Sequence, residues 1–244
     1  IYFTSGGTES DNWAIKAAAQ MLKEKGRHII TSKIEHHAIL NSCAYLEKQG
    51  FEVTYLDVDE WGSIRLDILE KAIRKDTILI SVMYANNEVG TIQKIAQIGK
   101  IAEKNDILFH TDAVQAYGQL LIDVKKENID LLSASAHKFN GPKGVGFLYI
   151  RKKIPLPEYI HGGKQERDHR AGTENVPGIA GLGLATKMIY NDLDMKVALM
   201  RELKDYFTEQ AEKIENTTVH GLKDEGSAPH IISVGFAGIR SEVL

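Results

Sequence analysis

The segment Ile107-Leu108-Phe109-His110-Thr111-Asp112-Ala113-Val114-Gln115 has the pattern of a buried strand that ends in polar residues. A second strand of small residues follows in Ser133-Ala134-Ser135-Ala136-His137-Lys138-Phe139, and it ends in a His-Lys pair. Asp112 stands 26 residues before Lys138, a spacing that fits one crossover between neighbouring parallel strands. We therefore expect both side chains at the carboxyl edge of one sheet, where open α/β sheets bind their ligands.

The rest of the chain alternates between short apolar runs and helical patterns, which predicts an α/β fold whose mainly parallel sheet has helices on both faces. The link from Gly141 to Gly144 is too short for a crossover helix, so the next strand should run antiparallel to its predecessor. Strands are predicted at 28–31, 51–56, 78–84, 107–110, 131–134, 145–150 and 230–236. Helices are predicted at 10–25, 39–48, 66–74, 95–104 and from 176 to about 215, with a break at 191–194.

This pattern suggests two domains. Residues 1–190 are expected to form a large domain that lacks its N-terminal segment, and residues 191–244 to begin a smaller, truncated α+β domain. The chain opens at Ile1 inside an apolar run and stops at Leu244, without the polar taper of natural termini. We therefore expect a segment of a longer protein.

Composition excludes several classes of partner. The formal charge is −3, from 30 basic and 33 acidic residues, so nucleic acid is not an expected partner. No apolar run approaches the length of a bilayer span and no charged-then-apolar leader is visible, so a membrane is not expected either. Cys43 is the one cysteine, which excludes an internal disulfide and favours a reducing, cytoplasmic location.

Lys138 and Asp112 carry the chemistry of the two quoted strands. A lysine that acts as an amine nucleophile needs a partly desolvated position, because burial disfavours its charged form. Pyridoxal phosphate needs a carboxylate that faces its ring nitrogen, and Asp112 can supply it, while Gln115 could donate to the ring hydroxyl. A solvated lysine in a surface turn and an aspartate that caps a helix are the alternatives.

Further candidates precede these strands. Thr4-Ser5-Gly6-Gly7-Thr8-Glu9-Ser10 opens the first helix, where glycines and free amide groups can bind a phosphate, although simple capping by Thr8 or Ser10 would give the same pattern. Glu35-His36-His37-Ala38 could supply an imidazole that stacks on a planar cofactor and moves protons. No metal is expected there, because adjacent histidines do not share a face. Asn86-Asn87-Glu88 ends a strand and could equally be a turn.

Taken together, these motifs resemble the cysteine desulfurases of the iron–sulfur assembly type, which are fold-type I pyridoxal-phosphate enzymes of the class V aminotransferase family. The resemblance spans essentially the whole chain. It rests on Thr4–Asn12, Glu35–Ala38, Asn86–Gly90, His110–Gln115, Ser133–Lys138 and Arg170–Thr173.

The resemblance implies a role for each residue. Lys138 would form the Schiff base with the cofactor, Asp112 would pair with its ring nitrogen, and Gln115 would reach its ring oxygen. His36 would stack on the ring and shuttle protons, and Asn87 would lie near the substrate and the ring oxygen of the cofactor. The phosphate would be held by Gly7, Thr8, Ser135 and His137, with Thr173 reaching the phosphate of the other subunit in a homodimer. The implied reaction converts L-cysteine to L-alanine and leaves the sulfur as an enzyme persulfide, which is passed to a sulfur-acceptor or iron–sulfur scaffold protein.

The chain also departs from the family pattern. The nucleophilic cysteine and the arginine that binds the substrate carboxylate are expected beyond Leu244, so residues 1–244 alone are expected to be inactive. Cys43 falls in the predicted helix 39–48 and is expected to be a core or helix-surface thiol. Other readings are a selenocysteine lyase or aminotransferase of the same fold type, and a non-catalytic scaffold for sulfur acceptors.

Overall fold

A seven-stranded sheet forms the centre of the computed structural model, which describes residues 1–243. Its strands follow the order β1-β7-β6-β5-β4-β2-β3. The bounds are β1 (Tyr2–Thr4), β2 (His28–Ser32), β3 (Glu52–Leu56), β4 (Thr77–Ser81), β5 (Leu108–Asp112), β6 (Leu131–Ser135) and β7 (Gly146–Ile150). Neighbouring strands in the part of the sheet that contains β6, β5, β4, β2 and β3 are parallel. β7 is antiparallel to both of its neighbours, β6 and β1. The predicted fold class and the reversed direction of β7 are confirmed.

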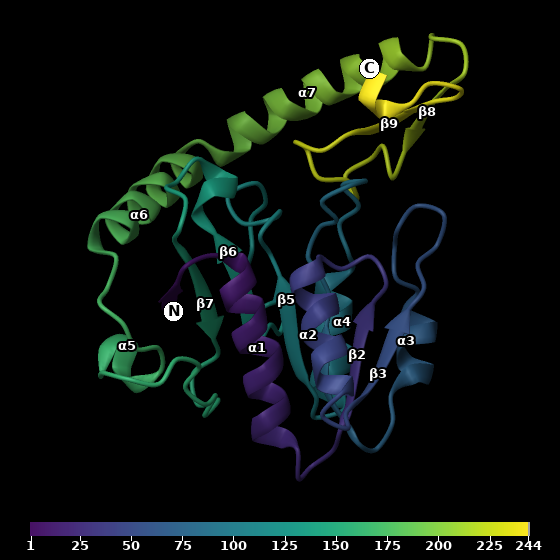
Figure 1. The fold of residues 1–244 in the computed structure, drawn as a ribbon. Helices are drawn as coiled ribbons and strands as arrows, with labels where there is room; N and C mark the ends of the chain where they lie inside the picture. Colours follow the sequence, from purple (N-terminus) through teal and green to yellow (C-terminus); the bar gives the residue numbers. More distant parts are fainter. Residues whose placement is uncertain (244) are drawn as a thin grey trace.

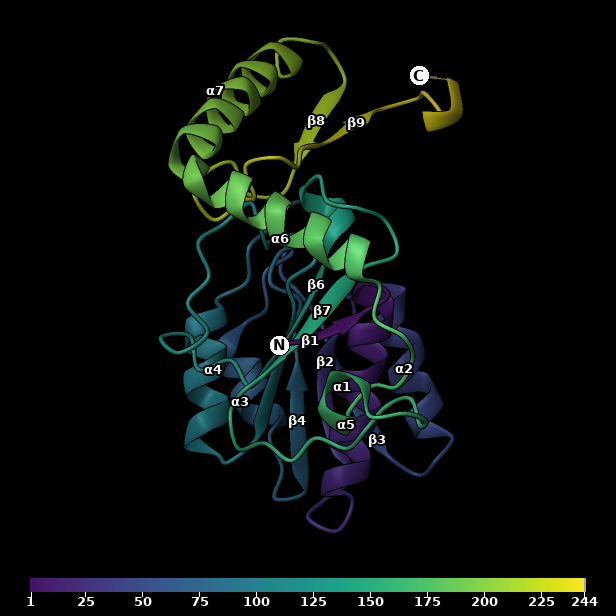
Figure 2. The ribbon, with the colours of Figure 1, turned by 90° about the vertical axis from the view of Figure 1, so that its left-hand side faces the viewer.

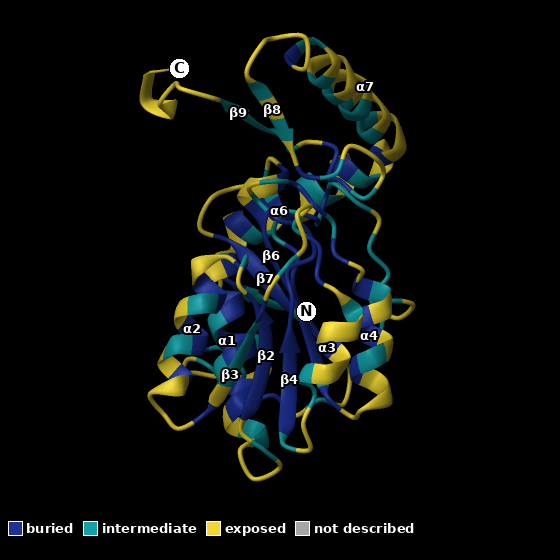
Figure 3. Cartoon of the chain, turned by 90° about the vertical axis from the view of Figure 1, so that its right-hand side faces the viewer, coloured by how far each residue is buried: buried dark blue, intermediate teal, exposed yellow. Residues whose placement is uncertain are grey.

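Helices cover both faces of the sheet, as predicted (Figures 1 and 2). One face carries α1 (Gly7–Leu22) and α2 (His37–Glu47), and the other carries α3 (Leu66–Ala72) and α4 (Ile95–Lys104). The central strands are buried on both sides (Figure 3). Adjacent strand residues therefore serve opposite faces, so that Ile29 packs in the core on the α1 side and Ile30 in the core on the α4 side.

The last part of the chain lies beyond the carboxyl ends of the parallel strands (Figures 1 and 2). It contains α6 (Val176–Asn191), α7 (Leu193–Ala211) and a two-stranded antiparallel sheet of β8 (Thr217–His220) and β9 (Ser233–Phe236). The predicted break in the long helix is present at Asp192. The predicted division into domains at residue 190 falls at the end of α6 and stays a prediction.

Several short elements were not predicted. β1 and β8 span three and four residues, too few to show a clear alternation. Two 3-10 turns, η1 (Ala136–Phe139) and η2 (Ser241–Val243), and the short helical turn α5 (Gln165–Asp168) are also present. The strand predicted at 78–84 ends at Ser81 in the structure. Beyond that end, the Tyr84 amide still donates a hydrogen bond to the Asp112 carbonyl at 2.8 Å. Within residues 1–243, no helix combines the length and the apolar character needed to cross a bilayer.

Candidate active site

A cavity of about 350 Å³ lies at the carboxyl edge of the sheet and collects most of the predicted site residues. Nine of the ten line it: Gly7, Thr8, His36, Asn87, Asp112, Gln115, Ser135, His137 and Lys138. They come from the starts of α1 and α2, from the ends of β5 and β6, and from the loops that follow β4, β5 and β6. Segments far apart in the sequence thus meet at the strand ends, where the parallel topology was expected to bring them.

Asp112 closes β5 and is buried, with 6% of its surface exposed. Its Oδ1 accepts a hydrogen bond from the Val114 amide at 2.9 Å, so it caps the turn that follows β5, and the helix cap that we named as the alternative is not observed. Burial raises the pKa of Asp112, while the Val114 amide and the charges of His36 and Lys138 act in the opposite direction. A carboxylate with one structural bond and a free side toward a cavity can also bind a cationic group there.

Lys138 follows β6 in η1 and is exposed, as is its neighbour His137. We expected this lysine to be partly desolvated. That expectation is wrong, because the turn leaves the amine open to water. Ser135 is buried, and its hydroxyl is joined to the Nδ1 of His137 by a hydrogen bond of 2.9 Å. That bond fixes the imidazole at the cavity.

The first turn of α1 has the features of an anion-binding turn. Its N-cap is Gly6, with φ +151°, a conformation that only glycine adopts readily, and no side chain caps the helix. The capping by Thr8 or Ser10 that we had considered is therefore not observed, and the first amide groups stay available to an anion. A Cβ on Gly7 would come within 2.5 Å of the Val114 side chain, so this glycine keeps the turn close to the cavity wall.

His36 is the N-cap of α2, and its Nδ1 accepts a hydrogen bond from the Ala38 amide at 3.1 Å. In the neutral imidazole this bond leaves the proton on Nε2, the atom free to act in the cavity. The rings of His36 and His37 are 6.3 Å apart and nearly perpendicular. Within the described residues, no three His, Cys, Asp or Glu side chains are grouped in a way that could hold a metal ion.

The two asparagines after β4 have different roles. Asn86 is buried, and its Oδ1 accepts from the amides of Glu88 and Val89 at 2.9 Å, so it builds the turn that we had named as the alternative. Asn87 lines the cavity, and its side-chain amide donates to Glu88 at 2.7 Å. Gln115, one turn after Asp112, is half-buried and also lines the cavity.

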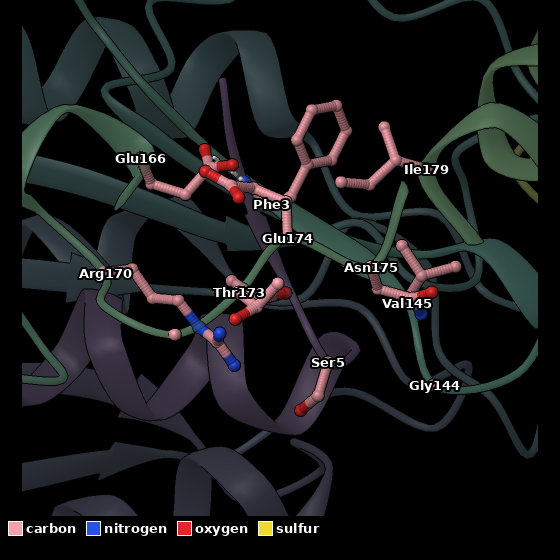
Figure 4. Close-up of a pocket in the computed structure, with 12 residues that line it drawn as sticks. Phe3, Ser5, Gly144, Val145, Glu166, Arg170, Thr173, Glu174, Asn175 and Ile179 are labelled. Carbon is pink, nitrogen blue, oxygen red and sulfur yellow. Dashed lines mark hydrogen bonds between the residues drawn. The ribbon is translucent and has the colours of Figure 1, made fainter. Parts of the chain in front are cut away.

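Thr173 lies apart from the other predicted residues. It lines a second, smaller cavity of about 180 Å³ together with Ser5, Gly144 and Arg170 (Figure 4). Arg170 reaches α1 from this side and binds both carboxylate oxygens of Glu9, at 2.7 and 3.1 Å. This bidentate ion pair is mostly buried and holds the segment before Thr173 against the start of α1. Any role of Thr173 toward another subunit stays a prediction.

Sequence reasoning gave no role to Asp11, which also lines the main cavity together with Met83, Ala85 and Val114. Asp11 is 1% exposed, and its Oδ1 is 3.7 Å from the Nε2 of the buried His110. A signal was present in the sequence. Asp11 stands four residues after Gly7 and three before Ala14, which places an acid on the buried face of the helix.

Cys43 lies in α2 and is fully buried. Burial raises the pKa of its thiol to about 12, with smaller effects from the charges of Glu35 and Glu47. The thiolate, which is the nucleophilic form, is therefore scarce at neutral pH. Cys43 is not among the residues that line the main cavity.

Comparisons with known proteins agree with this fold and site. The aminotransferase class-V family model matches residues 1–244, and the chain belongs to that family. It is 57% identical over its whole length to the cysteine desulfurase IscS of Methanosarcina thermophila, and it covers 60% of that protein. The resemblance inferred from the motifs is thereby confirmed.

Two solved structures extend the comparison. A NifS-like protein matches with a TM-score of 0.95 at 42% identity, over 99% of this chain and 66% of the other. A structure described as SspA in complex with cysteine matches with a TM-score of 0.74 at 49% identity, over 76% of this chain and 54% of the other. The chain spans about 60% of the length of the curated relatives it matches.

Proposed function

We propose that this protein is a pyridoxal-phosphate-dependent cysteine desulfurase. It takes the sulfur of L-cysteine, releases L-alanine, and carries the sulfur as a persulfide for iron–sulfur cluster or thio-cofactor assembly. The observation that carries the proposal is the cavity that joins a lysine, a buried aspartate, a histidine and the uncapped start of a helix. The similarity to proteins named cysteine desulfurase, and to one structure in complex with cysteine, supports the choice of substrate.

The residues present fit this cofactor. Its phosphate suits the uncapped first turn of α1, where Gly7 and Thr8 would hold it together with Ser135 and His137. Its ring nitrogen suits the buried carboxylate of Asp112, and its ring hydroxyl suits Gln115. When bound, pyridoxal phosphate supplies an electron sink for the bonds around the substrate's α-carbon.

The chain's own residues would bind, orient and move protons. Asp112 would face the ring nitrogen with a negative charge. Burial raises its pKa, and the charges of His36 and Lys138 act against that rise. Lys138 would provide the amine that attaches the cofactor, and the exposed turn leaves this amine room to move. His36, with its Nδ1 engaged by the Ala38 amide, would hold or transfer a proton at Nε2. Asn87 would contact the substrate.

The thiol that accepts sulfur is not Cys43 in this proposal. Cys43 is fully buried, and the raised pKa of its thiol, about 12, removes the reactive thiolate. The accepting cysteine would therefore lie outside residues 1–244, and so would the arginine that binds the substrate carboxylate. Residues 1–244 alone would bind cofactor and substrate but release no sulfide catalytically.

The partners of the whole protein follow from the same proposal. We infer a homodimer in which Thr173, beside Ser5 in the second cavity, contacts the cofactor phosphate of the other subunit. A sulfur-acceptor or iron–sulfur scaffold protein would receive the persulfide. Cys43 is a free thiol, and free thiols are typical of proteins in a reducing compartment. This favours a cytoplasmic location.

The test uses the full-length protein with added pyridoxal phosphate. We expect a visible absorbance band from bound cofactor. With a thiol reductant present to release the persulfide sulfur as sulfide, we expect alanine and sulfide in equal amounts from L-cysteine. A protein that acts on L-selenocysteine but not on L-cysteine would be a selenocysteine lyase, and one that transfers the amino group to a keto acid would be an aminotransferase. A protein without the band and without turnover would be a scaffold, and the proposal would fail.

A further inference from the structure

Asp11 lies on the buried side of the main cavity, and residues 1–243 place no positively charged group beside it. It is 1% exposed, yet it lines the same cavity as Asp112. Its Oδ1 is buried and has no hydrogen-bond partner within residues 1–243. An ionised carboxylate in this position would lose its hydration without compensation, which is costly in a protein interior.

The groups around Asp11 come from three elements. From β5, Asp112 shares the cavity and the Nε2 of His110 lies 3.7 Å from the Asp11 carboxylate. From β6, the hydroxyl of Ser133 is 3.0 Å from the Nε2 of His110, and its proximity lowers the pKa of Asp11. From the loop after β2, the Glu35 carboxyl group raises the pKa of Asp11 when it is ionised.

None of these neighbours supplies a positive charge. Burial lowers the pKa of His110 to about 3, so this imidazole is neutral at physiological pH. The charges of His36 and Lys138 act on Asp112, on the exposed side of the cavity. Two carboxyl groups that share a desolvated site cannot both ionise at low cost, so one of them keeps its proton.

We infer that Asp11 is a positioning residue that keeps a proton, so that Asp112 is the one ionised carboxylate at the buried side of the cavity. The inference rests on the proposed function, in which Asp112 faces the ring nitrogen of the cofactor. Burial raises the pKa of Asp11 well above its usual range, and the charge of Asp112 raises it further. A neutral Asp11 limits the site to one negative charge, matched to one protonated ring nitrogen.

The first experiment measures the protonation of Asp11 in the full-length protein without cofactor. A group whose pKa is raised on folding stabilises the native state at low pH, and this stabilisation is lost as the pH rises above the unfolded pKa. Urea unfolding of the wild type from pH 5 to pH 9 should therefore show a falling midpoint. Asp11→Asn, which mimics the protonated acid, should show a smaller fall, and the exposed control Asp205→Asn should behave like the wild type. A fall in Asp11→Asn as large as that of the wild type would show that Asp11 is ionised and overturn the inference.

The second experiment measures the affinity for pyridoxal phosphate by titration of the visible absorbance band. Asp11→Ala should bind the cofactor about tenfold more weakly, because loss of the carboxyl group leaves a gap in the buried wall of the cavity. Asp11→Asn should bind the cofactor within about threefold of the wild-type affinity, because the neutral asparagine mimics the protonated acid. If Asn is as weak as Ala, a negative charge at Asp11 is required and the inference is wrong. If the wild type itself shows no band, the proposed function fails, and the unfolding experiment still decides whether Asp11 carries a proton.

Discussion

Two sets of polar residues line the main cavity or lie directly behind its wall, and they differ in their exposure to water. The exposed set, His36, His137 and Lys138, lies in turns and at a helix start, open to water. The buried set, Asp11, Glu35, His110 and Asp112, lies against the sheet and is at most 6% exposed.

Burial decides what each set can do. In the buried set it raises the pKa of every carboxyl group and lowers that of the imidazole, which favours the neutral forms of Asp11, Glu35 and His110, while the charges of His36 and Lys138 support the ionised form of Asp112. The exposed residues are hydrated, and they can change contacts without breaking the core. We infer that the buried set fixes the charge of the site, whereas the exposed set contacts the ligand. Substitution of Lys138 should then change activity alone, while substitutions in the buried set should also change stability or its pH dependence.

The largest expected effect is that of Lys138→Ala, in the exposed set. Loss of the amine should reduce turnover of L-cysteine by on the order of 10³-fold or more and abolish covalent trapping of the cofactor by borohydride. The urea midpoint should stay unchanged, because the side chain is exposed. Peptide mass spectrometry identifies the modified lysine, and Lys143→Ala in the same turn is the matched control. An adduct that persists on Lys143 in Lys138→Ala would move the attachment site.

Asp112→Asn, in the buried set, should have the next largest effect. Asn keeps the oxygen that accepts from the Val114 amide, so the fold should persist. The charge opposite the ring nitrogen is lost, and turnover should fall about 10²-fold while cofactor content falls less than about threefold. Turnover and absorbance are measured on the same sample. Full activity in this variant would remove Asp112 from the mechanism and leave the buried set with a structural role alone.

The two sets also differ in how much the sequence could predict. Strand ends and turn motifs identified Lys138, His36 and Asp112, because parallel strands bring their carboxyl ends to one edge. The same local reasoning could not show that Asn86 builds a turn whereas Asn87 lines the cavity, since that depends on which side chain meets the amides of Glu88 and Val89. It also placed Lys138 in a partly desolvated position, which depends on neighbours that only the folded chain defines.

The fold shows the same limit. The alternation of apolar runs predicted the sheet, its helices and the reversed β7, because these patterns are long and periodic. It missed β1 and β8, whose few residues pair with partners distant in the sequence or across a loop. Asp11 was quoted in a motif but given no role, because its neighbours His110 and Ser133 come from strands more than 90 residues away.

Glu35→Gln tests the pH dependence that the buried set should confer. Burial raises the pKa of Glu35 from 4.5 to about 8, although Ser32 and the Met83 amide donate to its Oε1. The stability from the bound proton is complete below pH 4.5 and is lost as the pH rises toward 8, by about 1.4 kcal/mol for each unit of pKa difference at most. The glutamine side chain does not titrate in this pH range. The fall in the free energy of unfolding from pH 5 to pH 9 should therefore be smaller in Glu35→Gln than in the wild type. Parallel curves for both proteins in urea unfolding would contradict a protonated Glu35.

Cys43→Ser should have the smallest effect on activity, and it tests whether the core contains a hidden catalytic group. The thiol is fully buried and its pKa is raised to about 12, so we expect turnover of L-cysteine by the full-length protein to stay within about twofold of the wild type. The free energy of unfolding should fall by about 1–3 kcal/mol, because the serine hydroxyl enters an apolar environment where Ser42 already lacks a hydrogen-bond partner. Cys43→Ala separates the two effects, since it removes the thiol without adding a hydroxyl group. Loss of sulfide release in both variants, with the cofactor band retained, would identify Cys43 as the sulfur acceptor and show that burial in this fold does not exclude a residue from the chemistry.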